Sequence, residues 1–156
     1  MFSSKNKICM LGEGGVGKTS LVSLLQGKEI LKKRDPTVGL EIDDTMLNGC
    51  SKVAIWDLGG QERFRFLWKD FLKGSGLSVL VTDSTEENVK KTKEIYERFS
   101  NHIGSKVIAI ANKQDLPGAL SAEDVQKKLG IKTYEMCALR KELQSKLKKI
   151  LENEIS

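Results

Sequence analysis

A glycine-rich segment near the beginning of the chain has the residue types and spacing of a phosphate-binding loop. It reads Gly12-Glu13-Gly14-Gly15-Val16-Gly17-Lys18-Thr19, follows an apolar run and leads into apolar residues at helical spacing. Glycines let successive backbone N–H groups point at one polyphosphate, and the following helix N-terminus adds its positive dipole end. Alternatively, the segment is a glycine turn that binds nothing. We expect a nucleoside triphosphate site whose binding residues are Gly14, Gly15, Val16, Gly17, Lys18, Thr19 and Ser20.

Residues further along the chain, together with Thr19, could complete the metal site and the hydrolytic machinery. Mg²⁺ needs hard oxygen ligands, and we expect Thr19, Thr37 and Asp57 to provide them. Gly60 lets its N–H approach the γ-phosphate closely, and Gln61 could orient a water molecule for in-line attack. The predicted catalytic residues are therefore Lys18, Gly60 and Gln61. For the metal ligand Thr37 there is an alternative, because Asp35-Pro36-Thr37 taken alone could be an ordinary turn.

Two later segments predict which base is bound. The carboxylate of Asp115, in Asn112-Lys113-Gln114-Asp115, can accept hydrogen bonds from the N1–H and the exocyclic amine of guanine, a donor pair that adenine lacks. A base without these donors would leave the carboxylate buried and unpaired, so its binding is strongly disfavoured. We expect Lys113 to pack along the base and Asn112 to tie this loop to the phosphate loop. In Cys137-Ala138, the Ala138 N–H could donate to the guanine O6.

These motifs require a scaffold in which strand ends lie together, and the pattern of the chain predicts one. Asn48-Gly49 between two extended runs is a strong hairpin signal, and the remaining strands alternate with helices. This pattern favours a three-layer α/β fold with a mostly parallel six-stranded sheet, one antiparallel edge strand and ligands at the carboxyl ends of the strands. We expect strands over Lys5–Leu11, Leu40–Leu47, Lys52–Asp57, Leu77–Asp83, Lys106–Ala111 and Ile131–Met136. We expect helices over Lys18–Gln26, within 58–74, over Glu86–Ser100 after the caps Ser84 and Thr85, from Ser121, and along the stripe Leu139, Leu143, Leu147, Ile150 and Leu151.

Length and composition predict one globular domain spanning residues 1–156. Of the residues, 39% are apolar and 30% are charged, and no stretch approaches the length of a membrane span. Three widely spaced cysteines indicate free thiols and a cytoplasmic protein. The net charge of +5 comes from scattered lysine clusters, which we interpret as solvated helix surface, the alternative being attraction to anionic membranes or nucleic acid. We expect neither a lipid anchor nor a nucleic-acid partner. We expect the protein to be a monomer.

Together, these motifs resemble the small GTPases of the Ras superfamily, most closely the Arf branch. The Arf-like segments are Pro36-Thr37-Val38-Gly39, Trp56-Asp57-Leu58-Gly59-Gly60-Gln61 and Asn112-Lys113-Gln114-Asp115. The chain differs where Arf proteins usually carry a myristoylated amphipathic helix, because a predicted strand begins close to Met1. The resemblance implies a P-loop GTPase domain that uses GTP, GDP and Mg²⁺. It also implies an effector surface at Leu40, Trp56 and Phe71, for which core packing is the alternative.

Two functions remain open from the sequence. The first is a switch that hydrolyses GTP slowly and meets effectors, exchange factors and activating proteins, which could also bring it to the periphery of a membrane. The second is a guanine-nucleotide-bound interaction module that does not hydrolyse GTP. Arg34, three residues before Thr37, is a candidate internal arginine finger, although Lys32-Lys33-Arg34 is more simply a solvated charge run.

Overall fold

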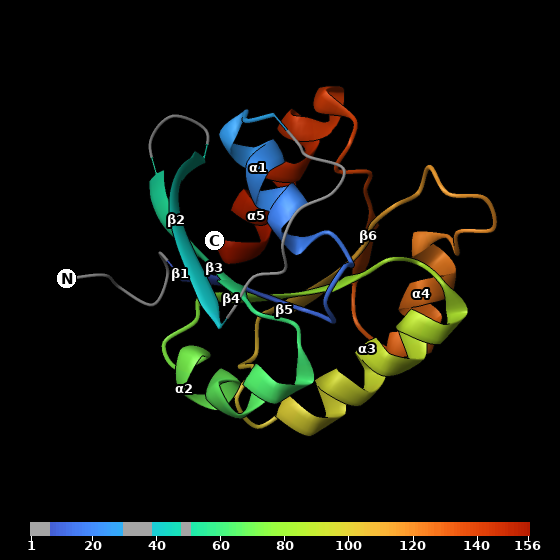
Figure 1. The fold of residues 1–156 in the computed structure, drawn as a ribbon. Coiled ribbons are helices and arrows are strands. Elements are labelled where there is room, and N and C mark those ends of the chain that lie inside the picture. The colour runs from blue at the N-terminus through green and yellow to red at the C-terminus, as the bar shows by residue number, and fades with distance from the viewer. Residues whose placement is uncertain (1–6, 30–38, 48–50) are drawn as a thin grey trace.

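The computed structural model describes residues 7–29, 39–47 and 51–156. Six strands form one sheet in the order β2-β3-β1-β4-β5-β6 (Figure 1). β2 pairs antiparallel with β3 at one edge, and the other neighbouring strands pair in parallel, which confirms the predicted α/β architecture. The strands are β1 (Lys7–Leu11), β2 (Leu40–Leu47), β3 (Ser51–Leu58), β4 (Leu77–Thr82), β5 (Val107–Ala111) and β6 (Thr133–Glu135).

Helices cover both faces of the sheet. α1 (Lys18–Gln26) and α5 (Gln144–Ile155) lie on one face, and α2 (Trp68–Phe71), α3 (Glu86–Phe99) and α4 (Ala122–Leu129) lie on the other (Figure 1). Two 3-10 helices, η2 (Glu62–Leu67) and η3 (Lys141–Leu143), precede α2 and α5. Because side chains alternate along a strand, neighbours in β1 enter different cores: Ile8 and Met10 pack with α1 and α5, whereas Cys9 and Leu11 pack with α2, α3 and α4.

Some sequence predictions lie outside the described residues. They are the start of the first strand before Lys7, the roles of Arg34 and Thr37, and the Asn48-Gly49 turn.

The structure corrects three local predictions. Leu139 does not belong to the last helical stripe: it is 49% exposed and precedes η3, while Ile155 is buried in its place at the end of α5. Ser84 does not cap α3, because its Oγ donates to the Asn112 carbonyl while Thr85 alone accepts from the Asn88 N–H. The sixth strand is shorter than predicted. Ser121 does cap α4, by accepting from the Asp124 N–H.

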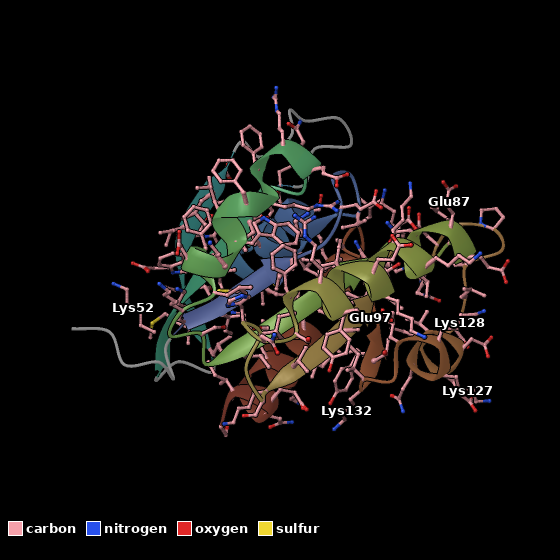
Figure 2. All side chains as sticks on the ribbon, turned by 90° about the horizontal axis from the view of Figure 1, so that it is seen from below. Lys52, Glu87, Glu97, Lys127, Lys128 and Lys132 are labelled. Atoms are coloured by element: carbon pink, nitrogen blue, oxygen red, sulfur yellow. The ribbon has the colours of Figure 1, made fainter. Side chains whose placement is uncertain are left out.

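The charged side chains of the helices lie mostly on the outside of the molecule. Figure 2 shows Lys127 and Lys128 of α4 at its periphery, and Lys127 forms an exposed ion pair with Glu123 at 3.6 Å. Within the described ranges, no helix has the length and apolar character to cross a membrane.

Candidate nucleotide and magnesium site

The phosphate loop connects the buried end of β1 to the first residue of α1. Val16 is only 1% exposed and anchors the middle of the loop in the core, whereas Gly14 and Gly15 are exposed. Gly17 has a φ of 102°, and a Cβ there would lie 2.2 Å from the Asn112 Nδ2. Glycine is therefore required both by the backbone conformation and by the close approach of Asn112. A Cβ added to Gly14 or Gly15 would meet nothing within 4 Å, so the exposed loop backbone has open space in front of it.

Lys18 is the buried cation of this loop. It is 5% exposed, and its Nζ donates to the carbonyls of Gly12 at 3.0 Å and Glu13 at 2.9 Å. Burial lowers the pKa of Lys18 to about 8, since removing an ammonium from water disfavours its charged form. The nearby charges act in opposite directions: Asp57 and Glu13 raise this pKa, and Arg65 lowers it. Burial is the largest of these effects, so the pKa of Lys18 stays below its ordinary value.

Thr19 and Asp57 bring two candidate metal ligands together. The Thr19 Oγ1 donates to the Asp57 Oδ2 at 2.5 Å, although 38 residues separate them. β1 and β3 are parallel neighbours, with Met10 opposite Asp57, so the end of β3 faces the loop that follows β1. A hydroxyl and a carboxylate are the hard oxygen donors that Mg²⁺ prefers, so this donor set fits the ion. Ser20 follows Thr19 in the first turn of α1 and is half-buried.

Gly60 and Gln61 lie beside the phosphate loop. A Cβ on Gly60 would come within 2.5 Å of Gly12 O, Glu13 C and Gly14 N, so only glycine fits this close approach. The side chain of Gln61 is half-buried, and its Oε1 accepts a hydrogen bond from the Arg63 Nε at 3.1 Å. Both residues line a cavity of about 380 Å³, together with Glu13, Gly14 and residues of η2 and α3.

Asn112 connects three segments at the end of β5. Its Nδ2 donates to the Val16 carbonyl at 3.0 Å, and its Oδ1 accepts from the Ala138 N–H at 3.2 Å. Lys113 adds a second connection, because its Nζ donates to the Gly15 carbonyl at 2.6 Å. The loop carrying the candidate base-binding residues is thus tied directly to the phosphate loop.

Asp115 and Cys137 are brought together from the ends of β5 and β6. The Cys137 thiol is buried, and its Sγ donates to the Asp115 Oδ1 at 3.3 Å. Asp115 itself is exposed, whereas the sequence argument for strong base discrimination assumed a buried carboxylate. The desolvation part of that argument therefore requires a bound base to cover Asp115. The Ala138 N–H already has a protein acceptor in Asn112.

The sequence patterns did not predict the polar side chains that hydrogen-bond to the backbone of these loops. Arg65 of η2 donates to the Gly60 carbonyl, Trp68 of α2 donates to the Gly59 carbonyl, and Ser84 donates to the Asn112 carbonyl. On α3, Lys91 forms an ion pair with Glu13 at 3.9 Å. These residues belong to no local motif; the one available signal was that a tryptophan and an arginine follow the Gly59-Gly60 pair within one short helical segment.

The expected effector residues share the edge of the sheet near β2. Leu40, Trp56 and Phe71 are each half-buried and pack against the core that contains α2 and α3. The rings of Trp56 and Phe71 meet edge to face with centroids 6.3 Å apart, and the Lys7 Nζ lies 3.6 Å from the centre of the Trp56 ring. The three side chains therefore contribute to the core and also leave apolar surface exposed.

Comparison with known proteins agrees with this arrangement. Residues 1–153 match the model of the ADP-ribosylation factor family. The chain is similar to ADP-ribosylation factor-like protein 4D of Homo sapiens, with 35% identity over 140 residues that cover 85% of this chain and 69% of the relative. It is similar to ADP-ribosylation factor-like protein 14 of Mus musculus, with 33% identity over 144 residues covering 88% and 73%. It is also similar to ADP-ribosylation factor-like protein 1 of Saccharomyces cerevisiae, with 34% identity over 129 residues covering 80% and 69%. These matches show that the chain belongs to the Arf family of small GTPases as a divergent Arf-like member.

Proposed function

We propose that this protein is a molecular switch that binds GTP and GDP with Mg²⁺, hydrolyses GTP slowly and signals through the loops around Gly60 and Thr37. The observation that carries the proposal is the convergence of Lys18, Thr19 and Asp57 beside the glycine loop. An ammonium and two hard oxygen groups lie together at the carboxyl ends of β1 and β3. They are joined by the Thr19–Asp57 hydrogen bond and by the two bonds of Lys18 to the loop carbonyls.

Each group would have a distinct part in binding. The N–H groups of the segment from Gly14 to Ser20 and the Lys18 ammonium would hold the β- and γ-phosphates. Mg²⁺, when bound, would neutralise charge on these phosphates, held by Thr19 and Asp57 and, as the sequence predicts, by Thr37. Around the base, Asp115 would accept from guanine, Lys113 would pack along the ring, and Cys137 and Ala138 would complete the wall.

Hydrolysis would depend on Gln61. To orient a water molecule, the Gln61 side-chain oxygen must accept a hydrogen bond from that water. In the structure, this oxygen accepts from Arg63 instead. Release of the exposed Arg63 contact would therefore accompany the active arrangement, which is consistent with slow intrinsic turnover.

Partner recognition would depend on the surface formed by Leu40, Trp56 and Phe71. These residues lie on β2, β3 and α2, and Leu40 directly follows Gly39 in the chain. The Gly59 N–H donates to the Gly39 carbonyl at 2.8 Å, so the backbones that lead into the two switch segments are joined directly. A conformational change in one segment would therefore alter the conformation of the other and of this apolar surface. Effectors and regulators would bind the surface in one of its two conformations.

A nucleotide-turnover experiment tests the proposal. Purified protein is denatured to identify any co-purified nucleotide, then reloaded with GTP and followed to GDP with and without Mg²⁺. We expect guanine nucleotide and slow turnover that requires Mg²⁺. Gln61→Ala should bind GTP normally and lose turnover, whereas Lys18→Ala should lose affinity. A wild-type chain that retains GTP without turnover would instead support the non-hydrolysing module, and one that binds no guanine nucleotide would refute both.

A further inference from the structure

Two adjacent carbonyls, those of Gly59 and Gly60, are each held by a side chain from the next helical turns. The Arg65 guanidinium donates to the Gly60 oxygen through Nε at 3.3 Å and Nη2 at 3.1 Å. The Trp68 Nε1 donates to the Gly59 oxygen at 3.1 Å, and this indole is fully buried against the Phe99 ring, whose centroid lies 5.1 Å away. The buried Trp68 indole thus fixes the Gly59–Gly60 peptide, and the charge-assisted hydrogen bond of Arg65 fixes the Gly60–Gln61 peptide.

The opposite side of Gly60 faces the phosphate loop. Its Cα lies so close to that loop that a Cβ would be 2.5 Å from Gly12 O, Glu13 C and Gly14 N. Gly60 is therefore confined between a guanidinium on its carbonyl and the backbone of the loop. Arg65 is half-buried and lines the same cavity as Gly14, Gly60 and Gln61.

We propose that Arg65 is a positioning residue that holds the Gly60 peptide against the phosphate loop and thereby favours GTP over GDP. The inference rests on the proposed function. The Gly60 N–H belongs to the peptide whose carbonyl Trp68 holds, and Arg65 holds the carbonyl of the next peptide, so Gly60 is fixed on both sides. A residue that is already fixed beside the loop loses less conformational freedom when its N–H meets the γ-phosphate than a mobile one does. GDP lacks that phosphate and gains little from this order, so the advantage is specific to GTP.

The test compares Arg65→Ala, Arg65→Lys and the control Lys69→Ala, which removes the same charge from an exposed position on α2. Dissociation constants are measured for GDP and for a non-hydrolysable GTP analogue. For Arg65→Ala we expect affinity for the analogue to fall by about 10-fold, in line with loss of a charge-assisted hydrogen bond, and affinity for GDP to change by less than about 3-fold. Arg65→Lys keeps the charge but cannot place two donors on one oxygen, so it should resemble Arg65→Ala.

Hydrogen exchange provides a readout independent of the bound triphosphate. In the GDP-loaded protein, amides of residues 59–62 should exchange faster in Arg65→Ala than in Lys69→Ala, with similar exchange in β4 and β5. Equal effects of Arg65→Ala and Lys69→Ala in both measurements would overturn the inference, as would full recovery of analogue affinity in Arg65→Lys. If the wild-type chain binds no guanine nucleotide, the proposed function fails, and the same exchange comparison on the nucleotide-free proteins still decides whether Arg65 holds the Gly60 segment.

Discussion

Replacement of Asn112 should destabilise the fold itself. The side chain is 1% exposed and satisfies two backbone groups from distant segments, the Val16 carbonyl and the Ala138 N–H, both of which belong to buried residues. Asn112→Ala leaves both groups without their partner. A buried polar group that loses its hydrogen bond costs about 1–3 kcal/mol, so the two together should lower the free energy of unfolding by about 2–6 kcal/mol.

That loss is large relative to the stability of a typical domain, which is about 5–15 kcal/mol. For a chain of this size, 1 kcal/mol corresponds to about 2–4 °C, so a loss near the lower end of the range should lower the melting temperature by roughly 4–8 °C. Asn112→Asp separates the two bonds. It retains an acceptor for the Ala138 N–H but places an oxygen against the Val16 carbonyl, so we expect a comparable loss despite unchanged volume.

The assay is urea unfolding followed by circular dichroism, with GDP and Mg²⁺ held constant and then at a second concentration. The control is Asn101→Ala, an exposed asparagine after α3, which should stay within about 0.5 kcal/mol of wild type. Dependence on nucleotide concentration separates loss of ligand affinity from loss of intrinsic stability, because ligand stabilisation follows mass action. If Asn112→Ala matched Asn101→Ala after this correction, the reasoning that Asn112 bridges three segments would be refuted.

Three further predictions concern single side chains. Thr85→Ala should lower the free energy of unfolding by about 1 kcal/mol in a denaturant titration, because Thr85 caps α3 through the Asn88 N–H; no loss would contradict this role. Glu13→Gln should tighten nucleotide binding about 2–5-fold in a displacement assay, since it removes a carboxylate from the phosphate loop; weaker binding would show that the ion pair with Lys91 matters more. Burial raises the pKa of the Cys9 thiol, so the folded state retains this proton at pH values where the unfolded chain has lost it. This group should therefore reduce stability as the pH rises above about 9, and peptide mapping after alkylation at pH 8 should find Cys9 unmodified in folded protein; rapid labelling would contradict its burial.

Much of the fold followed from local sequence patterns. The alternation of strands and helices predicted the six-stranded sheet, because apolar periodicity and turn residues act over short distances. The exceptions occur where tertiary contacts decide. Serine is a common helix cap, yet the Ser84 hydroxyl donates to the Asn112 carbonyl at the neighbouring strand end. Leu139 continues the apolar spacing of the last helix, yet it is exposed because the chain turns before α5 begins.

The sequence by itself determined the kinds of groups that the candidate site contains: a glycine loop with Lys18 and Thr19, an acidic residue at a strand end, and a predicted base-binding segment around Asp115. The tertiary structure decided how these groups are connected. Asn112 and Val16 are 96 residues apart, and Arg65 acts on Gly60 through a contact that no residue pattern specifies. The physical reason is that a parallel sheet gathers the ends of distant strands at one edge, where the partner of each polar group is chosen by distance and burial.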